Sequence, residues 1–264
     1  MSEPHQEVVA RGGSLASLQQ DWDGFGKDDP LWRILSLPDK KGGKWTLDEF
    51  FETGRKEIDE LLDYLKKVGL NPARGTALDF GCGVGRLTQG LARHFDRVKG
   101  VDISPSMIDL ARQYNRFGDH VEYFVNARSD LRLFPDRSFD LIYSSITLQH
   151  VPPQFSRQYI ADFVRVLRPG GAIVFQLPHK RTLVPVPRFY GMAKRVFEFL
   201  PQSLLHVYHQ ARYGDTPFAF MYGIPRPRVR SIIEHSGGAV VDIRTTTMGQ
   251  WTSCIYCATT ARKA

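Results

Sequence analysis

The sequence predicts a doubly wound α/β fold around a mostly parallel β-sheet, and three observations support this. Apolar strand-like runs alternate with helical patterns over residues 76–178, a glycine-rich turn follows the first run, and an acid ends the second. Alternation of strands and helices is typical of parallel βαβ units. Ligands of such sheets bind beyond the carboxyl ends of the strands, so polar residues at those ends are candidates for function.

The expected elements follow one another at regular intervals. Strands are expected near residues 76–80, 97–101, 120–125, 139–145 and 172–177, and helices near 85–94, 105–115 and 154–168. Ser104 followed by Pro105 is typical of a helix start, because the hydroxyl caps a free N–H and proline fits the first turn. Pro169 and two glycines end the last helix of this series.

The glycine turn lies between the first strand and its helix. Gly81, Gly83 and Gly85 alternate with other residues directly after the apolar run that begins at Thr76. Glycine permits positive φ and a close approach of a ligand to the backbone, and a helix N-terminus offers unpaired N–H groups. The turn therefore predicts a ligand site, with a tight turn that binds nothing as the alternative.

Asp102 ends the second apolar run. It follows Gly81 by 21 residues, which is close to the spacing at which an acid on the second strand holds ribose hydroxyls. A carboxylate can accept hydrogen bonds from both hydroxyls of a ribose. The glycine turn and Asp102 together predict a nucleoside-containing ligand.

Four segments resemble the motifs of class I S-adenosylmethionine (SAM) methyltransferases, most closely domain types 11 and 25. Leu78–Gly85 and Gly100–Met107 are similar to the first two motifs, and Phe134–Tyr143 and Leu167–Gly171 match the lead-ins to the fourth and fifth strands. The resemblance covers roughly residues 76–178, in the family's order. An enzyme that binds NAD would share the turn and the acid but not the last two segments.

The resemblance implies a Rossmann-like sheet of seven strands with an antiparallel last strand. The final two strands are then expected at 239–245 and 252–259, after a helix at 226–236. We divide the chain into an N-terminal helical arm over residues 1–45 and a methyltransferase domain over 46–264. A lid-like insertion at 179–222 follows the fifth strand, and Phe218–Pro225 resembles a further strand that returns to the core.

SAM is the cofactor that the resemblance implies, with S-adenosylhomocysteine as its product. It assigns the cofactor to residues at the strand ends, namely Asp79, Gly81, Cys82, Gly83, Gly85, Asp102, Ile103, Met107 and Ser144. It places the adenine at the loop after the third strand, nearest Ser129, Asp130 and Leu131. There Asp130 is expected to accept from the exocyclic amine and Leu131 to cover the ring.

Arg55 is a further candidate for the cofactor site. Thr46 and Glu49 form a capping-box pattern that predicts a helix to about Val68, and Arg55 interrupts its apolar stripe. In class I enzymes a helix before the first strand often lies beside the methionine tail, so Arg55 is expected to bind the SAM carboxylate in a two-point contact. The alternative is a solvated surface arginine.

His150 is the candidate general base. It lies just after the fourth strand, and a neutral imidazole titrates near working pH, as removal of a hydroxyl proton requires. His179 after the fifth strand and Tyr222 are second and third candidates. The alternative for His150 is a helix cap or a contact to the edge of the cofactor.

Two nucleic-acid methylation classes are disfavoured by the motifs. Tyr143–Ile146 stands where DNA amino-methyltransferases have Asn or Asp followed by two prolines and an aromatic residue. Cytosine C5 methylation needs a nucleophilic cysteine, but Cys82 belongs to the glycine turn. Cys254 and Cys257 are expected on opposite faces of one strand. His206 and His209 lack a third partner in the sequence, so we predict no metal site.

Aromatic side chains stand out in two polar or basic segments. Residues 1–20 are polar and expected to be mobile, whereas 21–45 contain Trp22, Phe25, Trp32 and Trp45, which either staple the arm to the domain or cover the site. Residues 185–200 form a basic amphipathic pattern. This pattern is interpreted as a substrate lid, as a contact to a membrane surface or lipid-linked acceptor, or as packing alone.

Composition bounds the function only broadly. The 264 residues carry a net charge of +7, but lysine and arginine are scattered, so nucleic acid is not the favoured partner. Three cysteines, no leader pattern and no long apolar run predict a cytoplasmic protein. The favoured function is O-methylation of a small-molecule, sugar or lipid-linked acceptor. The alternatives are an RNA or protein methyltransferase and a SAM-binding protein without turnover, and the oligomeric state stays open.

Overall fold

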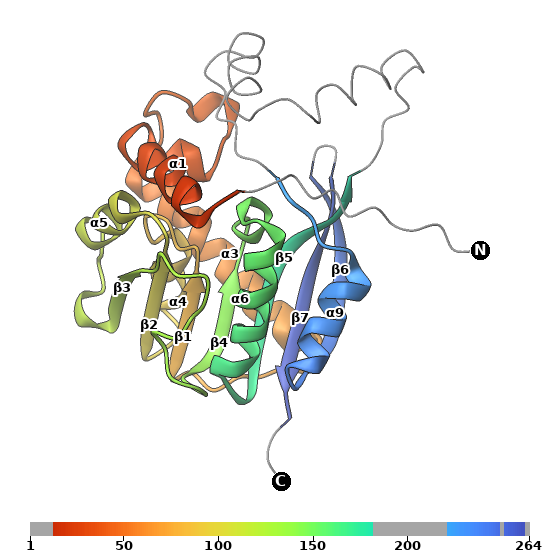
Figure 1. Cartoon of the computed structure of the whole chain (residues 1–264). Coiled ribbons are helices and arrows are strands. Elements are labelled where there is room, and N and C mark those ends of the chain that lie inside the picture. The colour runs from red at the N-terminus through yellow and green to blue at the C-terminus, as the bar shows by residue number, and fades with distance from the viewer. Residues whose placement is uncertain (1–12, 182–220, 249–250, 262–264) are drawn as a thin grey trace, which may run out of the picture.

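A seven-stranded sheet forms the centre of the molecule. The computed structural model describes residues 13–181, 221–248 and 251–261 (Figure 1). The strands are β1 (Thr76–Phe80), β2 (Arg97–Asp102), β3 (Val121–Val125), β4 (Phe139–Ser144), β5 (Leu167–Arg181), β6 (Gly238–Met248) and β7 (Trp251–Thr260). Their order across the sheet is β3-β2-β1-β4-β5-β7-β6.

The direction of the strands confirms the predicted fold class. β1 to β5 pair in parallel, and β7 runs antiparallel to both of its neighbours, β5 and β6. β5 is longer than expected because its pairing with β7 continues as far as Arg181. The order reverses between β1 and β4, so the carboxyl ends of β1, β2 and β4 border a crevice where ligands of doubly wound sheets bind.

Helices cover both faces of the sheet. They are α1 (Leu15–Lys27), α2 (Pro30–Ile34), α3 (Leu47–Lys67), α4 (Arg86–Leu91), α5 (Pro105–Gln113), α6 (Pro153–Val166) and α9 (Arg226–His235), with short 3-10 turns at η1 (Pro38–Lys40), η2 (Gly118–His120) and η3 (Leu148–His150). Figure 1 shows α6 and α9 on the near face and α3 and α4 behind the sheet. Two apolar clusters, one on each face, form the core.

The predicted helix starts are present. The Thr46 hydroxyl accepts from the Glu49 N–H at 3.3 Å, and the Glu49 carboxylate accepts from the Thr46 N–H, which completes the capping box of α3. Ser104 caps α5 by accepting from the Met107 N–H at 3.2 Å. Both caps satisfy N–H groups that have no partner within the helix.

The cysteine prediction is also confirmed. Cys254 belongs to the apolar cluster beneath α6 and α9, whereas Cys257 belongs to the cluster beneath α3 and α4. All three cysteines are free and buried. The pair therefore serves packing on two faces of β7.

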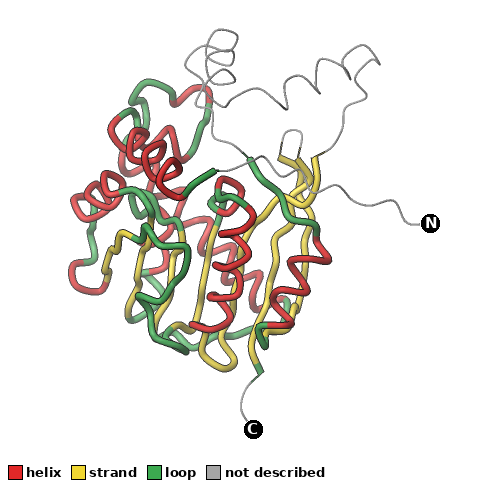
Figure 2. The backbone as a smooth tube through the Cα atoms, viewed as in Figure 1, coloured by secondary structure: helices red, strands yellow, loops and turns green. Residues whose placement is uncertain are grey.

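Two local expectations are wrong. α1 begins at Leu15, within the segment expected to be mobile, because Ser14 caps it and its apolar residues find a partner surface on the domain. Residues 221–225 form an extended strap outside the sheet, where a strand was expected (Figure 2). The strap cannot join the sheet beside β5, because β4 and β7 already occupy both edges of that strand. Its backbone instead donates from Tyr222 to the Gln149 carbonyl and from Ile224 to the Pro178 carbonyl.

Candidate functional site

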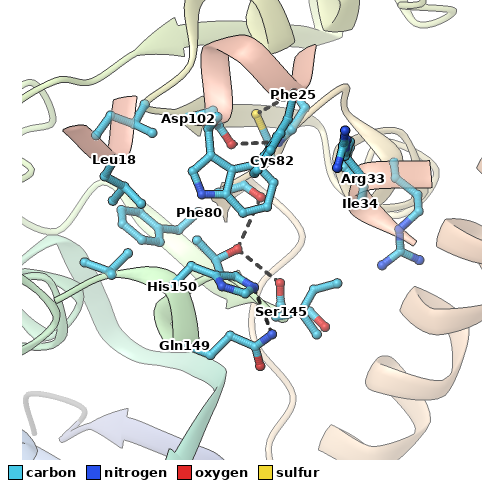
Figure 3. Close-up of a pocket in the computed structure, with 18 of the residues that line it drawn as sticks. Leu18, Phe25, Arg33, Ile34, Phe80, Cys82, Asp102, Ser145, Gln149 and His150 are labelled. Carbon is cyan, nitrogen blue, oxygen red and sulfur yellow. Dashed lines mark hydrogen bonds between the residues drawn. The ribbon is translucent and has the colours of Figure 1, made fainter. Parts of the chain in front are cut away.

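A cavity of about 520 Å³ lies at the carboxyl ends of β1, β2 and β4, beneath the N-terminal arm. Its floor includes Gly81, Cys82 and Gly83 of the glycine turn together with Asp102 and Ile103, as predicted from the sequence. Figure 3 shows Cys82, Asp102 and Phe80 on one side of this space and Ser145, Gln149 and His150 on another. The topology thus brings three strand ends to one hollow.

The glycine turn is built for close backbone packing. Gly81 has φ +77° and Gly83 has φ +52°, which are conformations that side chains rarely adopt. A Cβ at Gly81 would overlap the Thr147 side chain, and one at Gly83 would lie 2.7 Å from Ile34 Cδ1. Gly85, with φ +86°, begins α4 and does not line the cavity.

Three N–H groups of the turn are partnered within the protein. Those of Gly81 and Cys82 donate to the Val101 carbonyl at 2.8 and 3.1 Å, and that of Gly83 donates to the Asp102 carboxylate at 2.9 Å. These three donors are therefore committed to the protein, and the Gly83 N–H orients the Asp102 carboxylate.

Asp102 occupies the place predicted for it. Its carboxylate lines the cavity and accepts from the N–H groups of Gly83 and Ser104, each at 2.9 Å. Burial raises the pKa of Asp102, and these two N–H donors act in the opposite direction. The backbone thus aims a carboxylate at the cavity and holds it in one orientation.

Asp79 lies beneath the turn rather than in the cavity. Its Oδ2 accepts from the Thr88 hydroxyl at 2.6 Å, while Oδ1 is buried without a hydrogen-bond partner in the described structure. Burial raises the pKa of Asp79 to about 7, and the Thr88 hydroxyl opposes this rise. Asp79 is a core residue that supports the turn from below.

The loop after β3 places different residues at the cavity from those predicted. Asn126 lines the cavity, whereas Ser129, Asp130 and Leu131 do not. The Asn126 amide donates to the Asp130 carbonyl at 2.9 Å, and the Leu131 N–H donates to Asp162 at 3.0 Å. These bonds turn the end of the loop into the protein.

Two other predicted cofactor residues are held in the core. Ser144 is fully buried, and its hydroxyl donates to the Phe80 carbonyl at 2.9 Å, while the next residue, Ser145, lines the cavity. Met107 is also fully buried, in the apolar cluster beneath the arm. Neither Ser144 nor Met107 lines the cavity.

Arg55 is not brought to the cavity. It forms ion pairs with Glu52 and Asp59, three and four residues away on the same helix face, and these hold its guanidinium on α3. The cavity instead receives Arg86 and Arg33. Arg86 follows the glycine turn directly, so its position next to the motif was a signal that the sequence interpretation missed.

Both cavity arginines have acidic partners. Arg86 donates to Glu57 at 2.8 Å, and Glu57 also accepts from the Tyr143 hydroxyl at 2.8 Å. Arg33 pairs with Asp28, and its guanidinium lies 4.8 Å from the centre of the Phe25 ring. Positive charge at the cavity is therefore largely balanced by protein carboxylates.

His150 lines the cavity at the end of η3. Its ring stands edge-on to Trp22 with centroids 5.4 Å apart, and its Nε2 lies 3.0 Å from the Gln149 side-chain nitrogen. The other two base candidates do not line the cavity: His179 Nδ1 accepts from the Arg226 N–H, and Tyr222 is buried in the strap. His150 is the predicted base that the fold brings to the site.

The arm supplies an apolar wall that the sequence interpretation assigned only in part. Leu15, Leu18, Trp22 and Phe25 of α1 line the cavity, followed by Ile34 and Leu35. α1 is tied to the domain by the Gln19 amide, which donates to the Ile103 carbonyl at 2.9 Å, and by Asp23, which accepts from the Ser106 N–H at 2.8 Å. Of the predicted aromatic residues, Trp22 and Phe25 line the cavity, whereas Trp32 and Trp45 are buried in the apolar cluster of the arm.

The described residues contain neither a cluster of metal ligands nor a membrane-spanning helix. No group of three or more His, Cys, Asp or Glu side chains there could hold a metal ion. No helix in that same part of the chain is long and apolar enough to cross a membrane. His206, His209 and most of the predicted insertion, from residue 182 to 220, lie outside the described residues.

Comparison with known proteins confirms the resemblance to class I SAM-dependent methyltransferases. Residues 78–175 match the family model described as a methyltransferase domain. A ubiquinone biosynthesis O-methyltransferase of Xylella fastidiosa is 34% identical over 144 residues, which are 54% of this chain and 56% of that protein. A demethylmenaquinone methyltransferase of Tropheryma whipplei is 39% identical over 116 residues, or 43% and 46% of the two chains. The chain thus spans about half the length of the curated relatives it matches.

Solved structures share the fold. Magnesium protoporphyrin IX methyltransferase from Synechocystis, solved with bound S-adenosylhomocysteine, superposes with a TM-score of 0.60 at 18% identity, covering 93% of this chain and 99% of that one. A methyltransferase from Galdieria sulphuraria, described as acting on sarcosine or dimethylglycine, superposes with a TM-score of 0.57 at 14% identity, covering 92% and 100%. At these identities the likeness concerns the fold.

Proposed function

We propose that this chain, whose residues 78–175 are a methyltransferase domain of the class I fold, binds SAM in the cavity and methylates a small-molecule acceptor there. One observation carries the proposal. A single cavity joins the glycine turn, the Asp102 carboxylate and the His150 imidazole under an apolar cover. The first two suit a nucleoside ligand, and the third suits removal of an acceptor proton.

Several residues of the cavity have distinct proposed parts in binding SAM. The bare backbone of Gly81 and Gly83 admits the ligand closely, and Asp102 accepts from the ribose hydroxyls. Asn126 and Ile103 border the adenine. Arg33 and Arg86 replace Arg55 as the candidates for the SAM carboxylate, because both line the cavity.

The chain accelerates transfer mainly through orientation. SAM carries an activated methyl group on its sulfonium, so the protein has to align the acceptor with that methyl and exclude water. Orientation of this kind supplies about 7–11 kcal/mol of barrier lowering. For a hydroxyl acceptor, His150 takes the proton as the oxygen bonds to the methyl carbon, which makes O-methylation the favoured reaction.

The apolar arm favours an acceptor with an apolar body. Leu15, Leu18 and Trp22 stand on the same cavity as His150, so an acceptor that reaches the base also contacts these side chains. The matched relatives are named for ubiquinone biosynthesis and demethylmenaquinone methylation, which supports a small molecule of this kind. A lipid-linked acceptor and a sugar carrying an apolar group remain within the proposed class.

An RNA or protein acceptor is less well supported. A polyanion would need unbalanced basic side chains converging on the cavity, but Arg33 and Arg86 are both paired with carboxylates. SAM binding without turnover is the third alternative. One result separates this alternative from the proposal: a SAM-binding protein without turnover transfers no methyl group to any acceptor.

The substitution Asp102→Ala tests the cofactor site. We expect the dissociation constant for SAM, measured by calorimetry, to rise more than tenfold, which corresponds to the loss of one charged hydrogen-bonding group, about 1.5–3 kcal/mol. Asp109→Ala, an exposed acid on the neighbouring helix α5, is the matched control and should leave the constant unchanged. Equal SAM affinity of the Asp102→Ala and wild-type proteins would remove Asp102 from the ribose site.

A further inference from the structure

A row of buried, hydrogen-bonded polar side chains leads from β7 through β5 to His150. It consists of Ser253 on β7, Gln176 on β5 and Gln149 on η3, which are 0%, 7% and 6% exposed. Side chains alternate along β5 and β7, so Gln176 and Ser253 lie on the face opposite Leu177 and Cys254, the face that α3 and α4 cover. A buried polar group there is costly unless it is hydrogen-bonded. The mechanism proposed above uses none of these three residues.

The hydrogen bonds run outward from the Gln176 amide nitrogen. The Gln176 Nε2 donates to the Ser253 hydroxyl and, at 3.3 Å, to the Gln149 Oε1. With its oxygen engaged there, Gln149 presents its Nε2 amide to His150 Nε2 at 3.0 Å. With the Gln149 amide in this orientation its nitrogen donates and His150 Nε2 accepts.

We propose that Gln149 is a positioning residue that sets the tautomer of His150. A neutral imidazole has one protonated nitrogen and one lone pair, and an Nε2 that accepts from Gln149 places the proton on Nδ1. The ring therefore keeps its basic lone pair on Nε2. Gln176 and Ser253 maintain this arrangement by holding the Gln149 oxygen away from the ring.

The backbone of Gln149 adds to the rigidity of the arrangement. Its carbonyl accepts from the Tyr222 N–H at 2.7 Å, so η3 is tied to the strap. Trp22 packs edge-on against the His150 ring from the arm. Strap, arm and amide chain thus fix the ring from three elements.

This inference rests on the proposed function for its catalytic meaning. An acceptor hydroxyl that approaches Nε2 displaces the Gln149 amide and gives its proton to Nε2. A lone pair of the acceptor oxygen forms the new bond to the methyl carbon. The electrons of the broken carbon–sulfur bond stay on sulfur, which yields S-adenosylhomocysteine. A ring with the opposite tautomer would present an N–H at Nε2 and could not take that proton there.

Long-range ¹H–¹⁵N NMR of ¹⁵N-histidine-labelled protein tests the proposal without substrate or turnover. The signals of His150 are assigned by their absence from the His150→Gln protein, and spectra are recorded above pH 8, where imidazole is neutral. We expect a protonated Nδ1 and an unprotonated Nε2 in the wild type. A protonated Nε2 in the wild type overturns the proposal.

Substitutions of Gln149 sharpen the test. Gln149→Glu keeps the acceptor for Gln176 but replaces the donor by a carboxylate, so we expect the proton to move to Nε2. Gln149→Leu removes the donor, and a mixture of tautomers is expected. The exposed Gln113→Glu on α5 is the matched control and should retain the wild-type spectrum. An unchanged tautomer in either Gln149 variant contradicts the proposal.

Turnover measurements separate this inference from the proposed function. With a methyl acceptor in hand, Gln149→Leu is expected to lower kcat about tenfold while the SAM dissociation constant stays the same. If the tautomer shifts as predicted but no acceptor is ever methylated, the positioning stands and the proposed function fails. If kcat is unchanged while the tautomer shifts, Gln149 sets the tautomer of His150 without any effect on catalysis. That result overturns the catalytic part of the inference.

Discussion

The residues at the strand ends carry most of the predictable part of the site. Gly81, Gly83, Asp102 and His150 reach one cavity because each lies at the carboxyl end of a parallel strand or in the segment that follows it. The carboxyl ends of parallel strands share an edge of the sheet. Residues one step farther along a loop were less predictable. Asn126 lines the cavity in place of the predicted Asp130, because a hydrogen bond from the Asn126 amide to the Asp130 carbonyl turns that end of the loop away.

His150→Gln tests the base at this scale. Glutamine keeps a polar side chain of similar reach but has no nitrogen that takes a proton, so we expect turnover to fall about 10²–10⁴-fold. The dissociation constant for SAM should remain within about twofold of the wild type, as measured by calorimetry. His94→Gln, a half-buried histidine paired with Asp59 far from the cavity, is the control. Full activity of the His150→Gln protein would exclude the base role.

Asp79 gives a prediction about pH. Its pKa is raised by burial to about 7 in the folded protein, against 3.8 for an ordinary aspartate, so the folded state binds this proton more tightly. The stability from Asp79 is therefore fully present below about pH 4 and is lost as the pH rises through 7.

Asp79→Asn removes that dependence. We expect the free energy of unfolding of the variant, relative to the wild type, to improve steadily from pH 4.5 to pH 8, as measured by urea titration. Asp109→Asn on the exposed face of α5 should show no such trend. A difference in unfolding free energy between the Asp79→Asn and wild-type proteins that stays constant over this pH range would contradict the raised pKa of Asp79.

At the scale of elements, the arm is where the sequence interpretation missed most. Leu15, Leu18, Trp22 and Phe25 recur at helical spacing, but this pattern was not used to predict α1. What secures the helix is tertiary, since Asp23 and Gln19 bind the start of α5 and the end of β2. The strap shows the same limit: residues 221–225 resemble a strand, but the sheet has no open position beside β5.

Asp23→Ala tests whether the arm depends on that anchor. Asp23 accepts from the Ser106 N–H in the first turn of α5, and the hydrogen bond from Lys27, together with this N–H, lowers its pKa to about 2. Loss of a side-chain cap of this type costs about 0.5–2 kcal/mol of folding free energy.

We expect faster hydrogen exchange throughout α1 in the Asp23→Ala protein, together with a loss of unfolding free energy of that size. Asp39→Ala, an exposed acid elsewhere in the arm, is the matched control. Unaltered exchange in α1 would show that its apolar contacts hold the arm alone.

At the scale of the whole molecule, the parallel pairing of the first five strands was predictable from the alternation of strands and helices, and the antiparallel last strand from the family resemblance. The identity of the cavity cover was not, because it depends on how α1 and α2 fold back over the carboxyl ends of the strands. Figure 1 shows the arm and α5 together at that end of the sheet. The proposed cofactor half of the site comes from local motifs, whereas the proposed acceptor half comes from tertiary contacts of a distant segment.

Transfer of labelled methyl groups from SAM into a fractionated cell extract tests the central claim most directly. The wild-type protein is compared with Asp102→Ala as the blank. We expect label in the lipid or small-molecule fraction with the wild type and little with the variant. Label confined to RNA or protein, or no transfer to any fraction by a protein that binds SAM, would contradict the claim that this cavity methylates a small-molecule acceptor.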